Sequence, residues 1–310
     1  MAFAFLFPGQ GSQSLKMMDG FADLPVVKAT FDEASAALGE DLWVMLQAEA
    51  PDAINATVNT QPLMLAAGVA TYRAWLEAGG AAPSAVAGHS LGEYSALVAA
   101  GSLAFADAVK LVRLRAEAMQ SAVPAGQGAM AAILSLSDDD IRAACAEAAQ
   151  GEVVEPVNFN SPGQVVIAGA KGAVERAMEI CKAKGAKRAL PLPVSVPSHC
   201  ALMKPAADKL AEALAKIEIK APAMTVLHNA DVVGYNDPAA IRDALVRQLY
   251  SPVRWTETIQ SLAAAGITQM AECGPGKVLA GLAKRIDGDV KCVALTDAAA
   301  LGAARAKLVA

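Results

Sequence analysis

The sequence has 310 residues, of which 55% are hydrophobic, and a formal net charge of −5 at pH 7, so it is long enough for one large domain or two unequal ones. The acidic balance argues against general nucleic-acid binding, and no apolar run approaches the roughly 20 residues that cross a bilayer. The five cysteines include no C-x-x-C pair, so we expect reduced thiols, a cytoplasmic protein and no metal site.

The first apolar run, residues 2 to 7, lacks a basic flank, and it predicts a buried strand, not a signal peptide. The following Pro8-Gly9-Gln10-Gly11 segment is either a plain strand-to-helix turn or a loop whose backbone N–H groups serve a site. Helical periodicity follows over residues 24–38 and 62–78, with Asn59 or Thr60 as the expected cap of the second helix.

A G-x-S-x-G segment follows, Gly88-His89-Ser90-Leu91-Gly92. It stands between a short apolar run that can be a buried strand and a segment that can open a helix. In that setting the pattern indicates a nucleophile elbow, in which a tight turn lifts the serine hydroxyl clear of the sheet. Because chance alone produces the bare pattern in roughly one sequence in ten of this composition, the context of the pattern must decide its meaning.

The segment 105–123 predicts a helix with one misplaced charge. Lys110, Arg113 and Glu117 fall on a solvated face, whereas Arg115 falls in the apolar stripe. Such an arginine either snorkels to water or joins a structural ion pair, or it binds a substrate carboxylate through its planar fork. The spacing leaves both interpretations open.

Residues 126–196 differ from the rest of the chain in the pattern of their apolar residues. Short apolar or alternating runs and two helical stretches follow one another in the order β-α-β-β-α-β, which matches a split βαβ, ferredoxin-like unit. Around it, strands alternate with helices in a way that predicts a mainly parallel, α/β-hydrolase-like sheet with helices on both faces. We therefore expect a catalytic domain at 1–125 and 197–310 with a ferredoxin-like subdomain inserted at 126–196.

A nucleophilic Ser90 needs an imidazole, and the sequence offers three histidines. His89 belongs to the turn and is interpreted as structural, and His228 lies in a predicted strand, where we expect it to be buried or at the strand end. His199 follows Val196-Pro197-Ser198 at the boundary of the inserted unit, where distant segments converge, and Ser198 can cap the next helix. His199 is therefore the preferred base, although spacing does not select its partner among the carboxylates Asp208, Glu212, Asp231, Asp237 and Asp243.

Several motifs together resemble the stand-alone bacterial malonyl-CoA:acyl-carrier-protein transacylases. They occur in that family's order over nearly the whole chain: the Gln10 loop, Gly88-His89-Ser90-Leu91-Gly92-Glu93-Tyr94, Arg115, Val196-Pro197-Ser198-His199, Gln248 and Gly274-Pro275-Gly276-Lys277.

The resemblance implies a ping-pong transfer of malonyl from malonyl-CoA to the phosphopantetheine thiol of acyl carrier protein through a malonyl ester, for fatty acid synthesis. It implies Ser90 as nucleophile, His199 as base and the Gln248 backbone carbonyl as the group that orients His199. It also implies backbone N–H groups of Gln10 and Leu91 as the oxyanion hole and Arg115 as the substrate-carboxylate site. Ser198 is expected to border the acyl pocket, and no cofactor or metal is expected.

Two other functions compete with this one. A serine esterase or thioesterase of similar fold would need an acidic triad member and would leave Arg115 and the Gln10 loop without a role. A non-catalytic module that binds carrier protein would not need the full set of site residues. Docking of an acidic carrier protein would require a local basic patch, and the candidate residues, which are equally compatible with an ordinary solvated surface, are Lys182, Lys184, Lys187 and Arg188.

Overall fold

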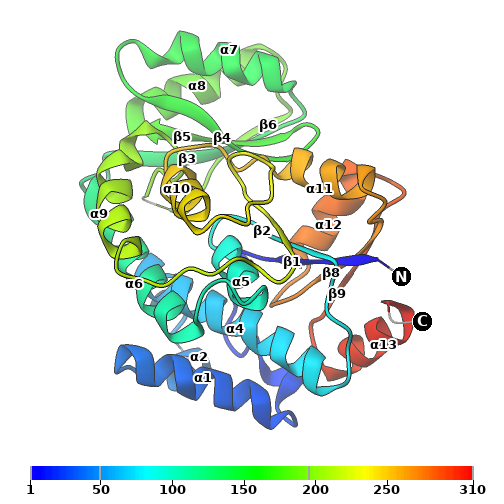
Figure 1. The fold of residues 1–310 in the computed structure, drawn as a ribbon. Coiled ribbons are helices and arrows are strands. Elements are labelled where there is room, and N and C mark those ends of the chain that lie inside the picture. Colours follow the sequence, from blue (N-terminus) through cyan, green and yellow to red (C-terminus); the bar gives the residue numbers. More distant parts are fainter. Residues whose placement is uncertain (1, 49, 195, 309–310) are drawn as a thin grey trace.

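A parallel sheet forms the centre of the molecule in the computed structural model, which describes residues 2–48, 50–194 and 196–308 (Figure 1). The strand order is β7-β2-β1-β8-β9, and all of the pairings are parallel. These strands are β1 (Phe3–Phe7), β2 (Ala85–Gly88), β7 (Thr225–Leu227), β8 (Gln269–Glu272) and β9 (Lys291–Ala294). The predicted mainly parallel sheet is confirmed.

Both faces of this sheet are covered, as the alternation of side chains along β1 shows. Phe3, Phe5 and Phe7 pack into one core cluster, and the Phe5 ring lies 5.1 Å from that of Trp75 in α4 (Thr57–Glu77). Ala4 and Leu6 belong to the cluster on the opposite face, which is closed by α11 (Trp255–Ala264) and α12 (Val278–Ile286). Successive strand side chains point to opposite faces, and because both faces are covered every residue of β1 is buried.

The helices on the α4 side contribute most of the larger core. Those that pack against one another there are α1 (Pro25–Leu38), α5 (Gly92–Ala99), α6 (Phe105–Ala122) and α9 (Lys204–Leu214). The other helices of the main body in the described residues are η1 (Asp19–Phe21), α2 (Leu42–Gln47), α3 (Pro51–Asn55), η2 (Ala201–Met203), α10 (Pro238–Gln248) and α13 (Ala298–Leu308). The sequence patterns did not indicate α2 and α3, because helices of six and five residues are too short to show a period.

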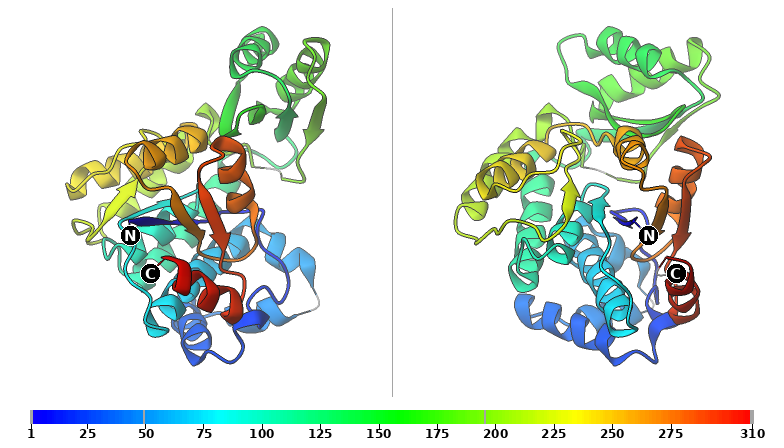
Figure 2. Two further views of the ribbon diagram at one scale, coloured as in Figure 1. Left: turned by 90° about the vertical axis from the view of Figure 1, so that its right-hand side faces the viewer. Right: turned by 45° about the vertical axis from the view of Figure 1, so that its right-hand side comes forward.

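A second, antiparallel sheet stands to one side of the larger body (Figure 2). Its strands β3 (Gly128–Leu134), β4 (Val154–Ser161), β5 (Gln164–Ala170) and β6 (Arg188–Pro191) have the order β4-β5-β3-β6. Its helices α7 (Asp138–Ala149) and α8 (Lys171–Ala183) bury their apolar stripes with the sheet in a cluster of their own. This order is that of a ferredoxin-like unit. The domain limits 125/126 and 196/197 remain a prediction.

The start of α4 differs from the expectation. The helix begins at Thr57, not at Pro62, and its N-cap residue Ala56 makes no side-chain cap. The apolar periodicity alone predicts a start at residue 62. Burial of the helix on nearly all sides outweighs the backbone bond that Pro62 cannot make. The predicted caps have other partners: Asn59 donates to Ala53 O at 2.9 Å, and Thr60 donates to Ile54 O at 2.6 Å.

Candidate active site

The Ser90 turn connects β2 to α5 at the carboxyl end of the parallel sheet, in the predicted strand, turn and helix order. Ser90 has a φ of +51°, which is uncommon for a residue with a side chain. The flanking glycines are required by close packing: a Cβ on Gly88 would lie 1.9 Å from Gly92 C, and one on Gly92 would lie 2.0 Å from Phe7 O. The turn therefore stands directly against the end of β1 with the serine side chain displayed.

His199 lies beside the serine. Its Nε2 is 2.7 Å from Ser90 Oγ, and its Nδ1 is 2.8 Å from the backbone carbonyl oxygen of Gln248. Because a carbonyl only accepts, we assign the proton to Nδ1, which leaves Nε2 as an acceptor for the serine hydroxyl. Burial, followed by the positive charge of Arg115, lowers the pKa of His199 to about 3, so its imidazole is neutral at pH 7.

The backbone also fixes the position of His199. The residue has a φ of +66°, and its N–H donates to Leu249 O at 3.0 Å. The predicted Ser198 cap is wrong, because the Ser198 hydroxyl bonds to Val196 O and η2 starts after Cys200 without a side-chain cap. The chain turns sharply at His199 and does not enter a helix there, so a capping serine has no helix to serve.

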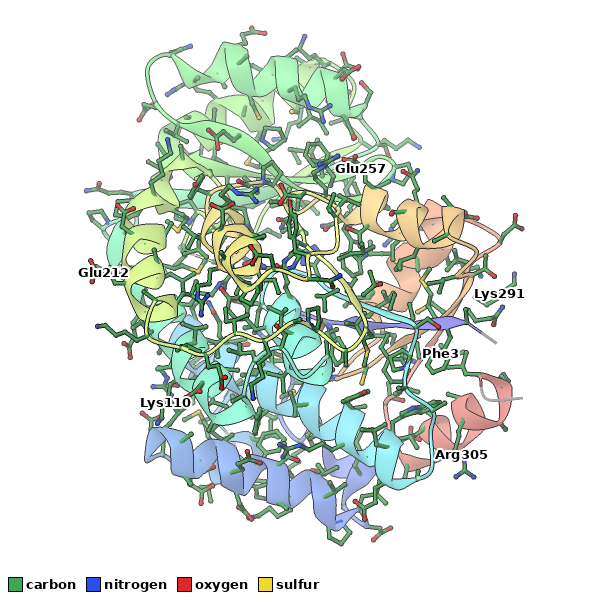
Figure 3. The ribbon with its side chains drawn as sticks, in the orientation of Figure 1. Phe3, Lys110, Glu212, Glu257, Lys291 and Arg305 are labelled. Carbon is green, nitrogen blue, oxygen red and sulfur yellow. The ribbon has the colours of Figure 1, made fainter. Side chains whose placement is uncertain are left out.

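Arg115 reaches the same serine from the buried face of α6, whereas Lys110 lies on the outer face of that helix (Figure 3). Its guanidinium donates to Gln61 Oε1 at 2.8 Å, to Gln248 Oε1 at 3.0 Å and to Ser90 Oγ at 3.2 Å. Arg115 is 1% exposed, and in the described residues it forms no salt bridge with a carboxylate. The snorkelling interpretation is therefore excluded, and the side chain is a buried cation held by neutral acceptors.

The glycine-rich loop after β1 closes another side of the site. A Cβ on Gly9 would lie 2.5 Å from His89 O and 3.7 Å from Leu91 N, so only glycine lets the loop approach the Ser90 turn this closely. The next residue, Gln10, lines the same pocket as Leu91. Leu91 is the N-cap residue of α5, where backbone N–H groups lack partners within the helix.

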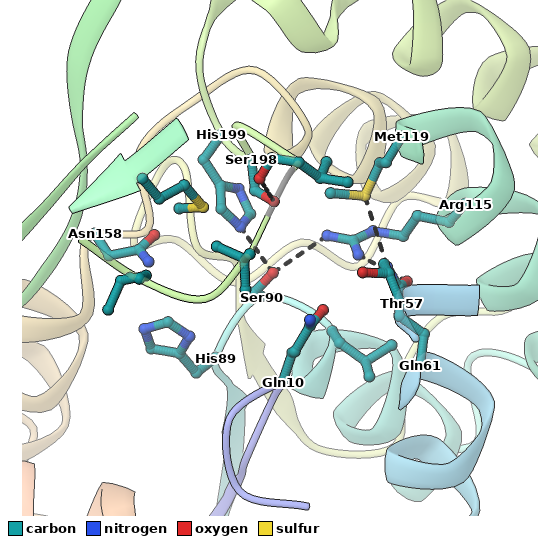
Figure 4. A pocket seen from close by; sticks show the side chains of 15 residues that line it. Gln10, Thr57, Gln61, His89, Ser90, Arg115, Met119, Asn158, Ser198 and His199 are labelled. Atoms are coloured by element: carbon teal, nitrogen blue, oxygen red, sulfur yellow. Dashed lines mark hydrogen bonds between the residues drawn. The ribbon is translucent and has the colours of Figure 1, made fainter. Parts of the chain in front are cut away.

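These side chains surround a pocket of about 130 Å³ (Figure 4). Its polar lining includes Gln10, Gln61, Ser90, Arg115 and His199, and Ser198 also borders it, as predicted. The small sheet and the segment after it add Met130, Asn158, Leu192, Val194 and Val196. The pocket thus has a polar end around Ser90 and an apolar wall from the second sheet.

The remaining histidines do not contact the serine hydroxyl. His89 lines the pocket, and its Nε2 is 2.8 Å from Asn160 Oδ1. His228 lies directly after β7, where its Nδ1 is 2.7 Å from Glu93 Oε1.

The five candidate carboxylates are not part of the site. Within the described part of the chain His199 makes no hydrogen bond to any of them, and several have other partners. Asp231 and Asp243 pair with Arg247, and Asp237 caps α10. The hydrogen-bond partner of the His199 Nδ1 is a backbone carbonyl.

Sequence reasoning missed three polar residues around the site, Gln61, Glu93 and Asn229, whereas His228 is buried just after a strand, as predicted. Asn229 accepts from Ser90 N–H at 2.7 Å and donates to Gly88 O at 2.6 Å. One available signal was its place just after β7, because residues that follow parallel strands collect at one edge of the sheet. Gln61 carried a weaker signal, as a polar residue inside an apolar helical stretch.

The predicted basic patch lies away from this pocket. Lys182 lies in the last turn of α8 in an ion pair with Glu179, and Arg188 pairs with Leu134 in the small sheet. Met130 and Leu192, which line the pocket, lie at the other end of the same pair of strands. Docking on this patch stays a prediction.

Neither a cluster of metal ligands nor a membrane-spanning helix occurs in the described residues. No group of three or more potential metal ligands occurs in residues 2–48, 50–194 and 196–308. Over the same ranges, no helix has the length and apolar character needed to span a membrane.

Comparison with known proteins gives concordant matches. The family described as acyl transferase domain matches residues 4–291. The malonyl CoA-acyl carrier protein transacylase of Escherichia coli K12 is 61% identical over 303 residues, which cover 97% of this chain and 98% of that protein. Its namesake from Bacillus subtilis is 45% identical over 296 residues, covering 95% and 93%.

Solved structures agree over the same length. The acyl-carrier-protein S-malonyltransferase of Burkholderia pseudomallei has a TM-score of 0.97 and 60% identity, and the match covers 99% of this chain and all of that one. A malonyl-transacylase solved in complex with a type II polyketide acyl-carrier protein has a TM-score of 0.97 and 57% identity, with coverage of 99% and 100%. The chain therefore belongs to the malonyl CoA-acyl carrier protein transacylase family of acyl transferases.

Proposed function

We propose that the protein transfers the malonyl group of malonyl-CoA to the phosphopantetheine thiol of acyl carrier protein, supplying the extender unit for fatty acid synthesis. The observation that carries the proposal is the meeting of three groups at one atom: Ser90 Oγ lies 2.7 Å from His199 Nε2 and 3.2 Å from Arg115 Nη2. A base beside the hydroxyl suits acyl transfer, and a buried cation beside it suits an acyl group that carries a carboxylate.

In the first half-reaction, His199 takes the Ser90 proton as Oγ forms a bond to the thioester carbonyl carbon. The oxyanion that develops is held by the N–H groups of Gln10 and Leu91. Collapse of this tetrahedral species breaks the C–S bond, His199 returns the proton to the departing CoA sulfur, and a malonyl ester remains on Ser90. In the second half-reaction the carrier thiol gives its proton to His199 and its sulfur attacks the ester, which restores Ser90.

Arg115 holds the free carboxylate of the malonyl group. Gln61 and Gln248 hold the guanidinium from two sides. The Arg115 side chain is therefore already ordered before substrate binds, and binding does not have to immobilise it. Fixing the acyl chain in this way aligns the ester for thiol attack. The apolar wall that the second sheet contributes to the pocket limits the access of water to Ser90.

The Gln248 carbonyl acts as the orienting partner of His199. A neutral carbonyl fixes the tautomer, as an aspartate does in other triads, but it stabilises the imidazolium less. Burial and the positive charge of Arg115 lower the pKa of His199, and they outweigh the hydrogen bond to Gln248 O, which raises it. This orienting contact also separates the proposal from the esterase alternative, which needs a carboxylate at Nδ1.

The deciding experiment mixes the protein with labelled malonyl-CoA, quenches the reaction with acid and searches the peptides by mass spectrometry. We expect a malonyl adduct on the Ser90 peptide that disappears when acyl carrier protein is added, with malonyl-carrier formed in equal amount. Absence of the adduct would instead support the non-catalytic module, and its rapid conversion to free malonate while carrier protein is ignored would support the esterase alternative.

The position of the His199 pKa predicts an unusual pH profile. An ordinary imidazole with a pKa of 6.5 would be only about 3% neutral at pH 5. With a pKa of about 3, His199 stays neutral, so the rate of Ser90 acylation should change less than about twofold between pH 7 and 5. Rapid-quench measurement of acylation by malonyl-CoA checks this, and a fall centred near pH 6.5 would contradict it.

Unlike the acylation rate, the stability of the folded protein should depend on pH, and the assay must control for this. Between pH 6.5 and about 3 the unfolded chain binds a proton at His199 that the folded chain does not. This shift therefore makes the folded protein less stable as pH falls through that window. Circular dichroism at each pH identifies the range in which rates refer to folded protein.

The proposed partners are malonyl-CoA and acyl carrier protein, and both the CoA thioester and the phosphopantetheine thiol are substrates. The proposed chemistry needs no cofactor or metal, since every proton transfer is made by His199. We place the protein in the cytoplasm, where reduced cysteines and these substrates occur together.

A further inference from the structure

The carboxylate of Glu93 lies directly beneath the Ser90 turn and has no part in the chemistry proposed above. Glu93 is in the first turn of α5 and is 0% exposed. Three N–H groups converge on it: His228 Nδ1 at 2.7 Å, Asn229 N at 2.9 Å and Gln248 Nε2 at 3.0 Å. A buried carboxylate is expensive unless it is fully hydrogen-bonded, so its retention here calls for an explanation.

One branch of this network leads to the base and to the arginine. The Gln248 side chain donates to Glu93 Oε2 and to Ser90 O, and its own oxygen accepts from Arg115 Nη2. The backbone carbonyl of the same residue accepts from His199 Nδ1. Gln248 thus contacts the Arg115 fork through its side chain and His199 through its backbone, and Glu93 holds the residue that makes both contacts.

The other branch leads to the nucleophile. Glu93 Oε2 accepts from the backbone N–H of Asn229. The Asn229 side chain in turn accepts from Ser90 N–H at 2.7 Å and donates to Gly88 O at 2.6 Å, so it spans the strained turn. A single carboxylate oxygen thus contacts both residues that hold the reacting groups.

We propose that Glu93 is a positioning residue for acyl transfer: its carboxylate, shared between Gln248 and Asn229, sets Ser90 in register with His199 and Arg115. The part of this proposal that concerns Arg115 as the site of the substrate carboxylate rests on the function proposed above. The part that concerns the alignment of Ser90 with His199 does not depend on that function. The positioning role requires the hydrogen bonds that the side chain at position 93 makes to Asn229 and Gln248. A glutamine at this position can accept from Asn229 N and Gln248 Nε2 with its oxygen, and it can donate to His228 Nδ1 in the other tautomer.

The test compares Glu93→Ala, Glu93→Gln and Glu272→Ala. Glu272 is also 0% exposed, and it accepts from Ala280 N–H at 2.8 Å at the start of α12. Glu272→Ala therefore controls for the removal of a buried, hydrogen-bonded carboxylate at a position away from Ser90. The first readout is the rate at which a fluorophosphonate labels Ser90, which needs His199 but no malonyl group. The second is the ratio of malonyl to acetyl transfer, which reports on Arg115. Thermal unfolding is measured for all three variants.

For Glu93→Ala we expect labelling to slow by about tenfold to a hundredfold and the malonyl-to-acetyl ratio to fall, because small misplacements of reacting groups are costly. Glu93→Gln should restore both readouts to within about threefold of the parent, and Glu272→Ala should leave both near the parent values. The proposal is overturned if Glu93→Ala keeps both readouts, if Glu93→Gln fails to restore them, or if Glu272→Ala loses as much.

Failure of the proposed function has a different signature. If the parent protein transfers no malonyl group to carrier protein, the function is wrong, yet the labelling rates still show whether Glu93 positions Ser90 against His199. If the parent transfers malonyl normally and the variants do not differ in labelling, only the role of Glu93 is wrong.

Discussion

Replacing Ser90 with alanine should abolish the malonyl-enzyme and lower the rate of malonyl transfer by about 10⁴-fold or more, as loss of a catalytic nucleophile does in other serine enzymes. The thiol next to the base in sequence is not a ready replacement. Cys200 follows the base in sequence, but it is fully buried and burial raises the pKa of its thiol to about 12, so it offers almost no thiolate at neutral pH.

The measurement is acid-quenched adduct formation together with transfer to carrier protein. Circular dichroism and thermal unfolding should match the parent, because the half-buried Ser90 Oγ gives up only its contacts to His199 and Arg115. Retention of more than about a tenth of the parent rate would mean that the acyl group is carried elsewhere or passes directly between thiols, since a lost nucleophile costs far more. Ping-pong kinetics in the parent separate these two outcomes.

The sequence carried enough information to predict the sheet, the Ser90 turn and the choice of His199, because each depends on a local pattern. Short apolar runs bounded by glycine and proline indicate buried strands, and a serine between two glycines at a strand end indicates an elbow. The helical phase of Arg115 likewise placed it in the core without any knowledge of the fold. The structure adds the reason that it stays there, namely two amide oxygens on Gln61 and Gln248.

The supports of the site could not be predicted from the same patterns. Asn229 is 139 positions from Ser90, and Gln61 is 54 positions from Arg115, so their contacts follow from the order of strands in the sheet and not from local spacing. Glu93 looked like an ordinary polar residue opening a helix. Its burial depends on the pairing of β7 with β2, because this pairing brings His228 and Asn229 against the first turn of α5, where they contact Glu93.

The partner of His199 shows the limit most clearly. Residue types can suggest an aspartate, but a backbone carbonyl has no signature in the sequence, since every residue has one. Gln248 was named only through the resemblance to a family. The structure places its carbonyl 2.8 Å from His199 Nδ1 because α10 ends there and leaves its last carbonyls without partners in the helix.

Replacing Arg115 with alanine should change which acyl group the protein prefers. A buried contact between a guanidinium and a carboxylate is worth about 2 to 5 kcal/mol when one partner is removed, so the ratio of malonyl to acetyl transfer should fall by about 30-fold to several thousandfold. Acetyl transfer should also slow, since Arg115 contacts Ser90 Oγ, but by a smaller factor. The quantity to measure is therefore the ratio of the two kcat/KM values.

Arg115→Lys provides the matched control. It keeps a positive charge but presents one ammonium in place of the planar fork, which cannot contact Gln61, Gln248 and a substrate carboxylate in the same geometry. Its selectivity should lie between those of the parent and Arg115→Ala. If malonyl and acetyl transfer instead fell by the same factor in both variants, Arg115 would serve only to hold Ser90 and Gln248 in place, and the carboxylate specificity would have to come from another group in the pocket.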